Sequence, residues 1–151
     1  MRWTDYLHIQ GASNEQIADE EAKVGHPFPG ALKNLLKERQ GWAPSPFNLT
    51  LSTGMEPAFL CLAPCAGPID AKDYTIRKET RHARDDNDEL DHLVAFAHSG
   101  GNARYCLDYS AANEPAVVYA DADYEVDDPR AFILIAPTFE DFLAIIELGQ
   151  K

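Results

Sequence analysis

The sequence is poor in cysteine and contains no long apolar run. Its 151 residues include three cysteines, Cys61, Cys65 and Cys106. An odd number without repeated spacing does not indicate a disulfide framework. Structural zinc usually needs four ligands, and Cys61 and Cys65 have no second ligand pair at zinc spacing. We therefore expect buried, reduced thiols.

Apolar segments are short throughout the chain. None approaches the roughly 18 apolar residues that are needed to cross a bilayer. The first six residues lead into no apolar run, so we expect no secretory signal. The expected location is the cytoplasm.

Basic side chains are also scarce. Thirteen Lys and Arg stand against 25 Asp and Glu, which gives a formal net charge of −12. Binding to nucleic acid requires Lys and Arg to displace counterions from phosphates, so neither nucleic acid nor an anionic membrane is an expected partner. A basic protein would be attracted and its association accelerated. The alternative is that the acidity only keeps the protein soluble.

Catalytic and cofactor motifs are missing too. The sequence has no HExxH, P-loop or GxGxxG motif. Ser99 lacks the glycine two residues earlier that a nucleophile elbow requires. The segment from Asp121 resembles the start of a calcium loop, but Val126 replaces the required glycine and Phe132 the bidentate glutamate. We expect no enzyme, no cofactor and no metal site.

The N-terminal part has helical patterns. Trp3–Ile9 is interpreted as a short helix. Ser13 and Gln16 form a capping box that starts a clearer helix, which Gly25 can end. A second helix is expected to begin near Pro29 and to end at Gly41, completing a helical hairpin with an apolar inner side.

Strand patterns follow, and the chain closes with a helix. Leu93–Ala97 is continuously apolar, as in a strand that is buried on both faces. Thr138 and Asp141 cap a last helix. The other strands are expected at Phe47–Leu51, Phe59–Leu62, Tyr105–Tyr109, Ala116–Tyr119 and Phe132–Ile135, with a helix within Ile69–Arg84 and a loop over Arg84–Asp91. This order predicts a single α+β domain over residues 1–151, with a largely antiparallel sheet and helices on one side.

Three blocks of residues resemble the SUKH superfamily. The first is Ile17-x3-Glu21-x3-Gly25 with Phe28-Pro29, Leu32, Leu35-Leu36 and Gln40-Gly41. The second is Val94–Ala97, Gly101-Asn102 and Tyr105–Asp108, and the third is Ile135–Leu143. The blocks follow the family order over nearly the whole chain. Phe28, Gln40 and Asn102 depart from the usual leucine, asparagine and aspartate.

The resemblance implies an α+β fold with a mixed, mostly antiparallel sheet, and a function in which the protein binds other proteins. Many bacterial members of the superfamily are immunity proteins that neutralise toxins, often nucleases. Other members are interaction modules without catalysis. Because the matching residues are turn glycines, a corner proline and core side chains, they indicate fold rather than function.

Two acidic clusters are the main candidates for binding a partner. If the second is extended, its carboxylates lie roughly 7 Å apart on one face and repel by about half a kcal/mol per pair in water. A basic toxin domain would relieve that repulsion. The alternative is a solvated charge run. The candidates are Asp85, Asp86, Asp88, Glu89 and Asp91 in the first cluster and Asp121, Asp123, Glu125, Asp127 and Asp128 in the second.

Trp42 is a further candidate, since it follows a helix end and stands beside Pro44. An aromatic side chain there can anchor a partner, or it can close one edge of the core.

The sequence leaves three functions to compare. They are an immunity protein that blocks a toxin with an acidic surface, a scaffold or regulatory module of the same fold, and an enzyme.

Overall fold

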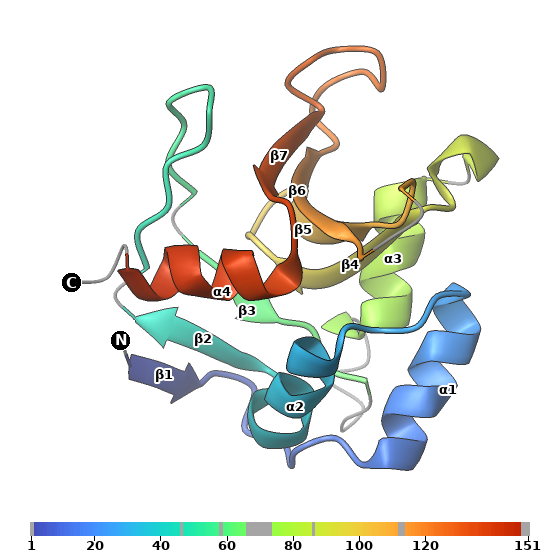
Figure 1. Ribbon diagram of the computed structural model, residues 1–151, viewed down its shortest axis with the longest axis vertical. Coiled ribbons are helices and arrows are strands. Elements are labelled where there is room, and N and C mark those ends of the chain that lie inside the picture. The colour runs from blue at the N-terminus through green and yellow to red at the C-terminus, as the bar shows by residue number, and fades with distance from the viewer. Residues whose placement is uncertain are drawn as a thin grey trace.

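The computed structural model describes residues 2–45, 47–57, 59–65, 74–85, 87–111 and 114–148. Its elements are listed here in chain order: β1 Arg2–Asp5, α1 Asn14–Val24, α2 Gly30–Arg39, β2 Trp42–Ser45, β3 Cys61–Leu62, α3 Ile76–Arg84, the 3-10 turn η2 Asp88–Leu90, β4 Leu93–His98, β5 Ala103–Asp108, β6 Ala116–Asp121, β7 Phe132–Ala136 and α4 Phe139–Leu148. Figure 1 shows them in one compact arrangement. The predicted α+β class is confirmed.

The N-terminal segment is a strand, so the helix expected over Trp3–Ile9 is wrong. β1 pairs antiparallel with β2, with Trp3 opposite Pro44 and Asp5 opposite Trp42. A helix of seven residues has little stability of its own, and pairing with a distant strand outweighs its apolar spacing. Sequence analysis had assigned no strand to the β2 segment.

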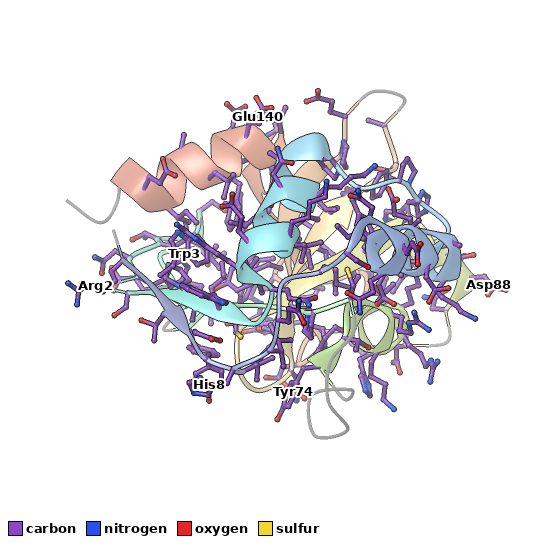
Figure 2. All side chains as sticks on the ribbon, turned by 90° about the horizontal axis from the view of Figure 1, so that it is seen from below. Arg2, Trp3, His8, Tyr74, Asp88 and Glu140 are labelled. Atoms are coloured by element: carbon purple, nitrogen blue, oxygen red, sulfur yellow. The ribbon has the colours of Figure 1, made fainter. Side chains whose placement is uncertain are left out.

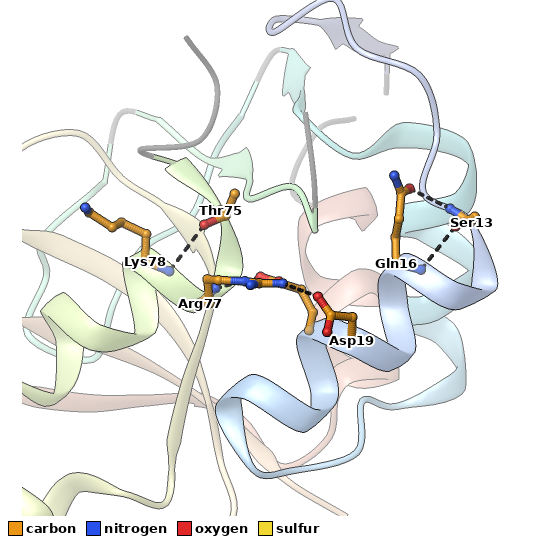
Figure 3. Close-up of polar contacts among 7 residues, drawn as sticks. Ser13, Gln16, Asp19, Thr75, Arg77 and Lys78 are labelled. Atoms are coloured by element: carbon orange, nitrogen blue, oxygen red, sulfur yellow. Dashed lines mark hydrogen bonds and ion pairs between the residues drawn. The ribbon is translucent and has the colours of Figure 1, made fainter. Parts of the chain in front are cut away.

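The helical hairpin is confirmed. The Ser13 hydroxyl accepts the Gln16 N–H at 3.1 Å, and the Gln16 side chain accepts the Ser13 N–H at 2.9 Å, completing the capping box (Figure 3). Gly25 ends α1 in the left-handed conformation, with φ of 85°. Ile17 and Val24 of α1 join the main core.

Five strands form the main sheet in the order β3-β4-β5-β6-β7, and every pairing in the described residues is antiparallel. The hairpin expected from Leu93–Ala97 through Ser99–Asn102 is present as β4 and β5. The sheet has one apolar cluster on each face. The front cluster receives residues of all four helices, including Ile76 of α3, whereas the back cluster is made by Leu90, Leu93, Ala95, Cys106, Val118 and Ala120.

Helix α3 runs along β4, where the short β3 leaves that strand unpaired (Figure 1). The Ala95 N–H donates to the Thr80 hydroxyl at 2.9 Å, so a helix side chain takes the place of a neighbouring strand. Ala83 packs against the back cluster. The helices are therefore not all on one side of the sheet. Of the helix predicted within Ile69–Arg84, residues 69–73 lie outside the described part.

The strand expected at Phe47–Leu51 is absent. The Leu51 N–H donates to the Met55 carbonyl at 2.8 Å, and the Gly54 N–H to the Leu51 carbonyl at 2.9 Å. These local turns use the backbone groups that a strand would pair, although Leu49 and Leu51 are still buried in the front core. The predicted loop Arg84–Asp91 contains the turn η2.

The C-terminal helix was predicted correctly. The Thr138 hydroxyl accepts the Asp141 N–H at 3.1 Å, and Phe139, Phe142 and Ile146 are buried in the front core. The predicted end at Gly149 lies outside the described residues. Within the described part, no helix combines the length and apolarity needed to span a bilayer.

Candidate interaction surface

A hollow of about 260 Å³ lies on the back face of the sheet, between the end of α3 and the segment that joins β6 to β7. Its apolar lining comes from Ala83, Leu90, Ala120, Ala122, Val126, Ala131 and Phe132. Its acidic lining comes from Asp85, Asp121, Asp123 and Glu125. Residues of the two acidic clusters, about 40 positions apart, thus meet around one cavity, which we call the back hollow.

The second cluster forms turns and is not an extended strand. Its carboxylates therefore do not lie in a row on one face, as an extended segment would place them. β6 ends at Asp121, whose Oδ1 accepts the Asp123 N–H at 3.0 Å. Further turns follow, with Asp128 N–H donating to Glu125 O at 2.9 Å and Ala131 N–H to Asp128 O at 3.0 Å. Asp favours such turns because its short carboxylate bonds the backbone two residues on.

The carboxylates of the second cluster differ in what they contact. Asp121 is buried and holds its own turn. Asp123 accepts the Asn102 amide at 2.8 Å. Asp128 is ion-paired with Arg130 at 2.7 Å, and the hydrogen bonds from Arg130 lower the pKa of Asp128 to about 2. Glu125 and Asp127 are exposed and form no ion pair with a described residue. They are the carboxylates of this cluster most open to a partner.

The first cluster is divided between two places. Asp85 ends α3 in the left-handed conformation, with φ of 45°, and lines the back hollow. Asp88 and Asp91 line a different hollow of about 280 Å³, whose lining also includes the basic residues Lys23, Arg77, Arg81 and Arg84. Glu89 is exposed, and its N–H donates to the Asn87 side chain at 3.0 Å. Asp86 lies outside the described residues.

Trp42 lines neither hollow. It is half-buried in β2, and the Arg39 guanidinium lies 5.9 Å from its ring and 5.6 Å from that of Trp3. Figure 2 shows Trp3 and Asp88 towards opposite ends of the molecule. Because Asp88 lines the second hollow and Trp42 shares Arg39 with Trp3, Trp42 lies away from that hollow.

Two features of the back face were missed in the sequence. Arg104 lines the hollow, but its charge is paired with the buried Glu79 of α3. Val126 and Leu134 are large apolar side chains that are 49% and 61% exposed. The alternation of side chains along β7 could have predicted that Leu134 points away from the front core. No neighbouring residue in the sequence indicated that Leu134 would remain exposed to solvent.

The thiols and His98 show no activated chemistry. Burial raises the pKa of Cys61, Cys65 and Cys106 to about 12, so they remain protonated. Burial also lowers the pKa of His98, whose ring lies 5.2 Å from that of Tyr74. Among the described residues, no group of three His, Cys, Asp or Glu side chains is placed to hold a metal ion.

Comparison with known proteins identifies one family. The sequence profile of the SMI1 / KNR4 family (SUKH-1) matches residues 11–145, which is nearly the whole chain. No curated protein gives a match.

Proposed function

Because the chain belongs to the SMI1 / KNR4 family (SUKH-1), we propose that it is a non-catalytic, cytoplasmic protein-binding domain and, more narrowly, a bacterial immunity protein. It would bind a basic toxin domain and block access of the substrate to the toxin. The observation that carries this proposal is the back hollow, where carboxylates from two distant segments surround an apolar floor.

The charge of the back hollow supports a cationic partner. Two of its carboxylates, Asp85 and Glu125, form no ion pair with any other residue that the structure describes. The same is true of Asp127, which follows Glu125 by two residues but does not line the hollow. Lys or Arg side chains from a partner would relieve the repulsion between these groups. A toxin that acts on nucleic acid needs a cationic face to hold phosphates, so an acidic surface can compete for that face. The net charge of −12 would also speed the encounter.

The alternative is a scaffold or regulatory module that uses the same fold without a toxin. A toxin gene beside the gene for this protein would favour immunity, and its absence would favour the module. An enzyme is the least supported of the three functions, since the buried thiols are protonated. Turnover in a broad hydrolase screen that is lost on changing one His or Cys would overturn the non-catalytic assignment.

The experiment is affinity capture from the native cell, followed by titration of the purified partner. The test variant combines Asp123→Asn, Glu125→Gln and Asp127→Asn, and it spares Asp121 because that carboxylate holds a turn. A matched control combines Glu38→Gln, Glu140→Gln and Glu147→Gln, which removes the same charge from exposed helical positions.

We expect the test variant to bind more weakly and with a flatter dependence on salt, because fewer charges are neutralised in the complex. The control should keep most of the affinity. Equal effects of the two variants would show that only the overall charge matters. An unchanged affinity and salt slope in the test variant would remove the back hollow from the interface.

A further inference from the structure

Strand β7 is the last strand of the sheet, and its outer edge forms no backbone hydrogen bond with another described segment. Its sequence, Phe-Ile-Leu-Ile-Ala, contains no charged residue and no proline. Proteins commonly protect edge strands with charges, prolines or covering segments, because an open edge can pair with another chain. The sequence of β7 carries neither a charge nor a proline for this purpose, and the register shift in its ladder with β6 falls only after Leu134, between the pairs Val118–Leu134 and Val117–Ala136.

The ladder with β6 shows which backbone groups of β7 point outward. The Asp121 N–H donates to the Ala131 carbonyl at 2.8 Å, and the register places Tyr119 opposite Ile133. Hydrogen-bonded and non-hydrogen-bonded pairs alternate in an antiparallel ladder. Ile133 therefore uses its backbone groups toward β6, whereas those of Phe132 and Leu134 point away from it.

The pairing on the other side of β6 gives the same alternation. The Ala122 N–H donates to the Asn102 carbonyl at 3.1 Å, and Ala120 lies opposite Arg104. Even-numbered residues of β6 thus bond to β5, and odd-numbered residues face β7. Two independent hydrogen bonds therefore agree that Phe132 and Leu134 offer free backbone groups at the outer edge.

Apolar side chains adjoin this edge on the back face. Leu134 is 61% exposed, and Phe132, two residues earlier on the same face, lines the back hollow. Val126 is 49% exposed at the same hollow. On the other face, Ile135 is only partly buried. An added strand would meet apolar surface on both of its sides.

We propose that β7 pairs with an extended segment of the partner in which cationic and apolar residues alternate. This rests on the proposed function in one respect, namely that the partner is basic. The cationic residues lie on the back face, with their aliphatic stems against Leu134 and their charges toward Asp123 and Glu125. The apolar residues lie on the front face beside Ile135. Strand addition gives affinity through the backbone and selectivity through the alternating side chains.

Charge decides between this occupant and a second copy of the chain. Two copies would bring together two molecules that each carry a net charge of −12. Such self-association works against long-range repulsion, whereas a cationic segment is attracted to the same edge.

The first test uses amide hydrogen exchange of the full chain with a blocked synthetic peptide of about ten residues in which Lys alternates with Val. We expect the amides of Phe132 and Leu134 to exchange at least about tenfold more slowly with this peptide. A peptide in which Glu replaces every Lys should give no protection. Equal protection by both peptides, or by neither, would overturn the proposal. So would protection without any peptide that rises with protein concentration, since a second copy would then occupy the edge.

The second test separates the backbone from the side chain at position 134. Leu134→Ala keeps the outward N–H, whereas Leu134→Pro also removes it and should leave the ladder with β6 intact. We expect the proline variant to bind the Lys-Val peptide about tenfold more weakly than the alanine variant. Equal binding would overturn strand addition. If the proline variant does not fold, the exchange experiment on the unchanged protein still decides.

Binding of the captured cellular partner to two variants tests strand addition at β7 separately from the acidic interface of the proposed function. Binding that survives Leu134→Pro but is lost in the Asp123, Glu125 and Asp127 variant would remove the strand addition and leave the acidic interface. The opposite result would remove the acidic interface and leave the edge. Loss in both variants, each with unchanged melting temperature, supports both proposals.

Discussion

Glu20 of α1 has no exposed side-chain surface, and its carboxylate accepts the backbone N–H of Arg77 of α3 at 2.8 Å. The Arg77 guanidinium is ion-paired with the same carboxylate and with Asp19, at 2.6 Å from the latter (Figure 3). One arginine thus joins the first helix to the third across 57 positions. Because an unpaired buried charge is costly, this pair requires both partners.

Removing Arg77 should destabilise the protein in a pH-dependent way. Arg77→Met leaves the buried Glu20 without its cation, so we expect a loss of about 3 kcal/mol in the free energy of unfolding at pH 7. Burial already raises the pKa of Glu20 above its usual range, so Glu20 binds a proton more readily in the folded protein than in the unfolded chain. The contribution of Glu20 is therefore fully present below pH 4.5 and declines as the pH rises through its folded pKa.

Urea denaturation between pH 4.5 and pH 7.5 measures this effect. The loss in Arg77→Met should grow as the pH rises, since loss of the cation raises the folded pKa of Glu20 further. Arg81→Met removes an exposed charge from the same helix and is the matched control. A loss that does not depend on pH would show that Glu20 is not the group left uncompensated.

Asp128 should stabilise its turn only when it is ionised. Its pKa is lowered to about 2 by hydrogen bonds from Arg130, so its contribution is present above the unfolded pKa near 3.8 and is lost as the pH falls to about 2. Asp128→Ala should lower the melting temperature at pH 7 and have a much smaller effect near pH 2, where about half of the Asp128 carboxyl groups are protonated. Asp127→Ala, at a neighbouring exposed carboxylate, should be nearly neutral at both pH values.

The three thiols should be unreactive in the folded protein. Burial raises the pKa of each to about 12, so almost no thiolate is present at pH 8. A disulfide reagent such as Ellman's should therefore react slowly with the native protein and should titrate three thiols after unfolding in guanidinium. Fast reaction of one equivalent in the native state would contradict this prediction and would reopen the possibility of a functional cysteine.

Gly11 should tolerate no side chain. A Cβ at this position would lie 1.9 Å from the carbonyl oxygen of Lys37, and the adjacent Ala12 N–H donates to Leu36 at 3.0 Å. The backbone of the first loop thus lies directly against the end of α2. Gly11→Ala should cost at least about 2 kcal/mol, since the two backbones must separate.

Gly30, the first residue of α2, provides the matched control. No atom lies within 4 Å of a Cβ built there. Gly30→Ala should be neutral or stabilising by up to about 1 kcal/mol, because alanine loses less backbone freedom in a helix. Equal losses for the two variants in urea denaturation would mean that the contact between Gly11 and α2 is not tight.

Local patterns were sufficient for elements that depend on neighbouring residues. The capping box at Ser13, the end of α1 at Gly25 and the cap at Thr138 each follow from hydrogen bonds within a few positions. The continuous apolar run at Leu93–Ala97 correctly predicted a strand that is covered on both faces. Capping residues form these hydrogen bonds with the adjacent helix end whatever the rest of the fold is, so they can be recognised from the sequence.

Other elements depended on partners far away in the chain. β1 exists because β2, about 40 positions later, pairs with it, and Trp3 has no local feature that indicates this. At Leu49 and Leu51, alternating burial was predicted correctly, but local turns took the backbone groups that a strand would use. Spacing alone predicts which side chains are buried better than it predicts which backbone groups pair.

The sequence by itself determined the class of the fold, the acidity and the presence of two dense carboxylate clusters, because these follow from composition and short-range order. Only the tertiary structure decided which carboxylates meet. The end of α3 brings Asp85 into the hollow that Glu125 also lines, whereas Asp88 and Asp91 line a second hollow together with basic residues. It also decided that β7 ends the sheet, because an edge is a property of the whole strand order and not of any one strand.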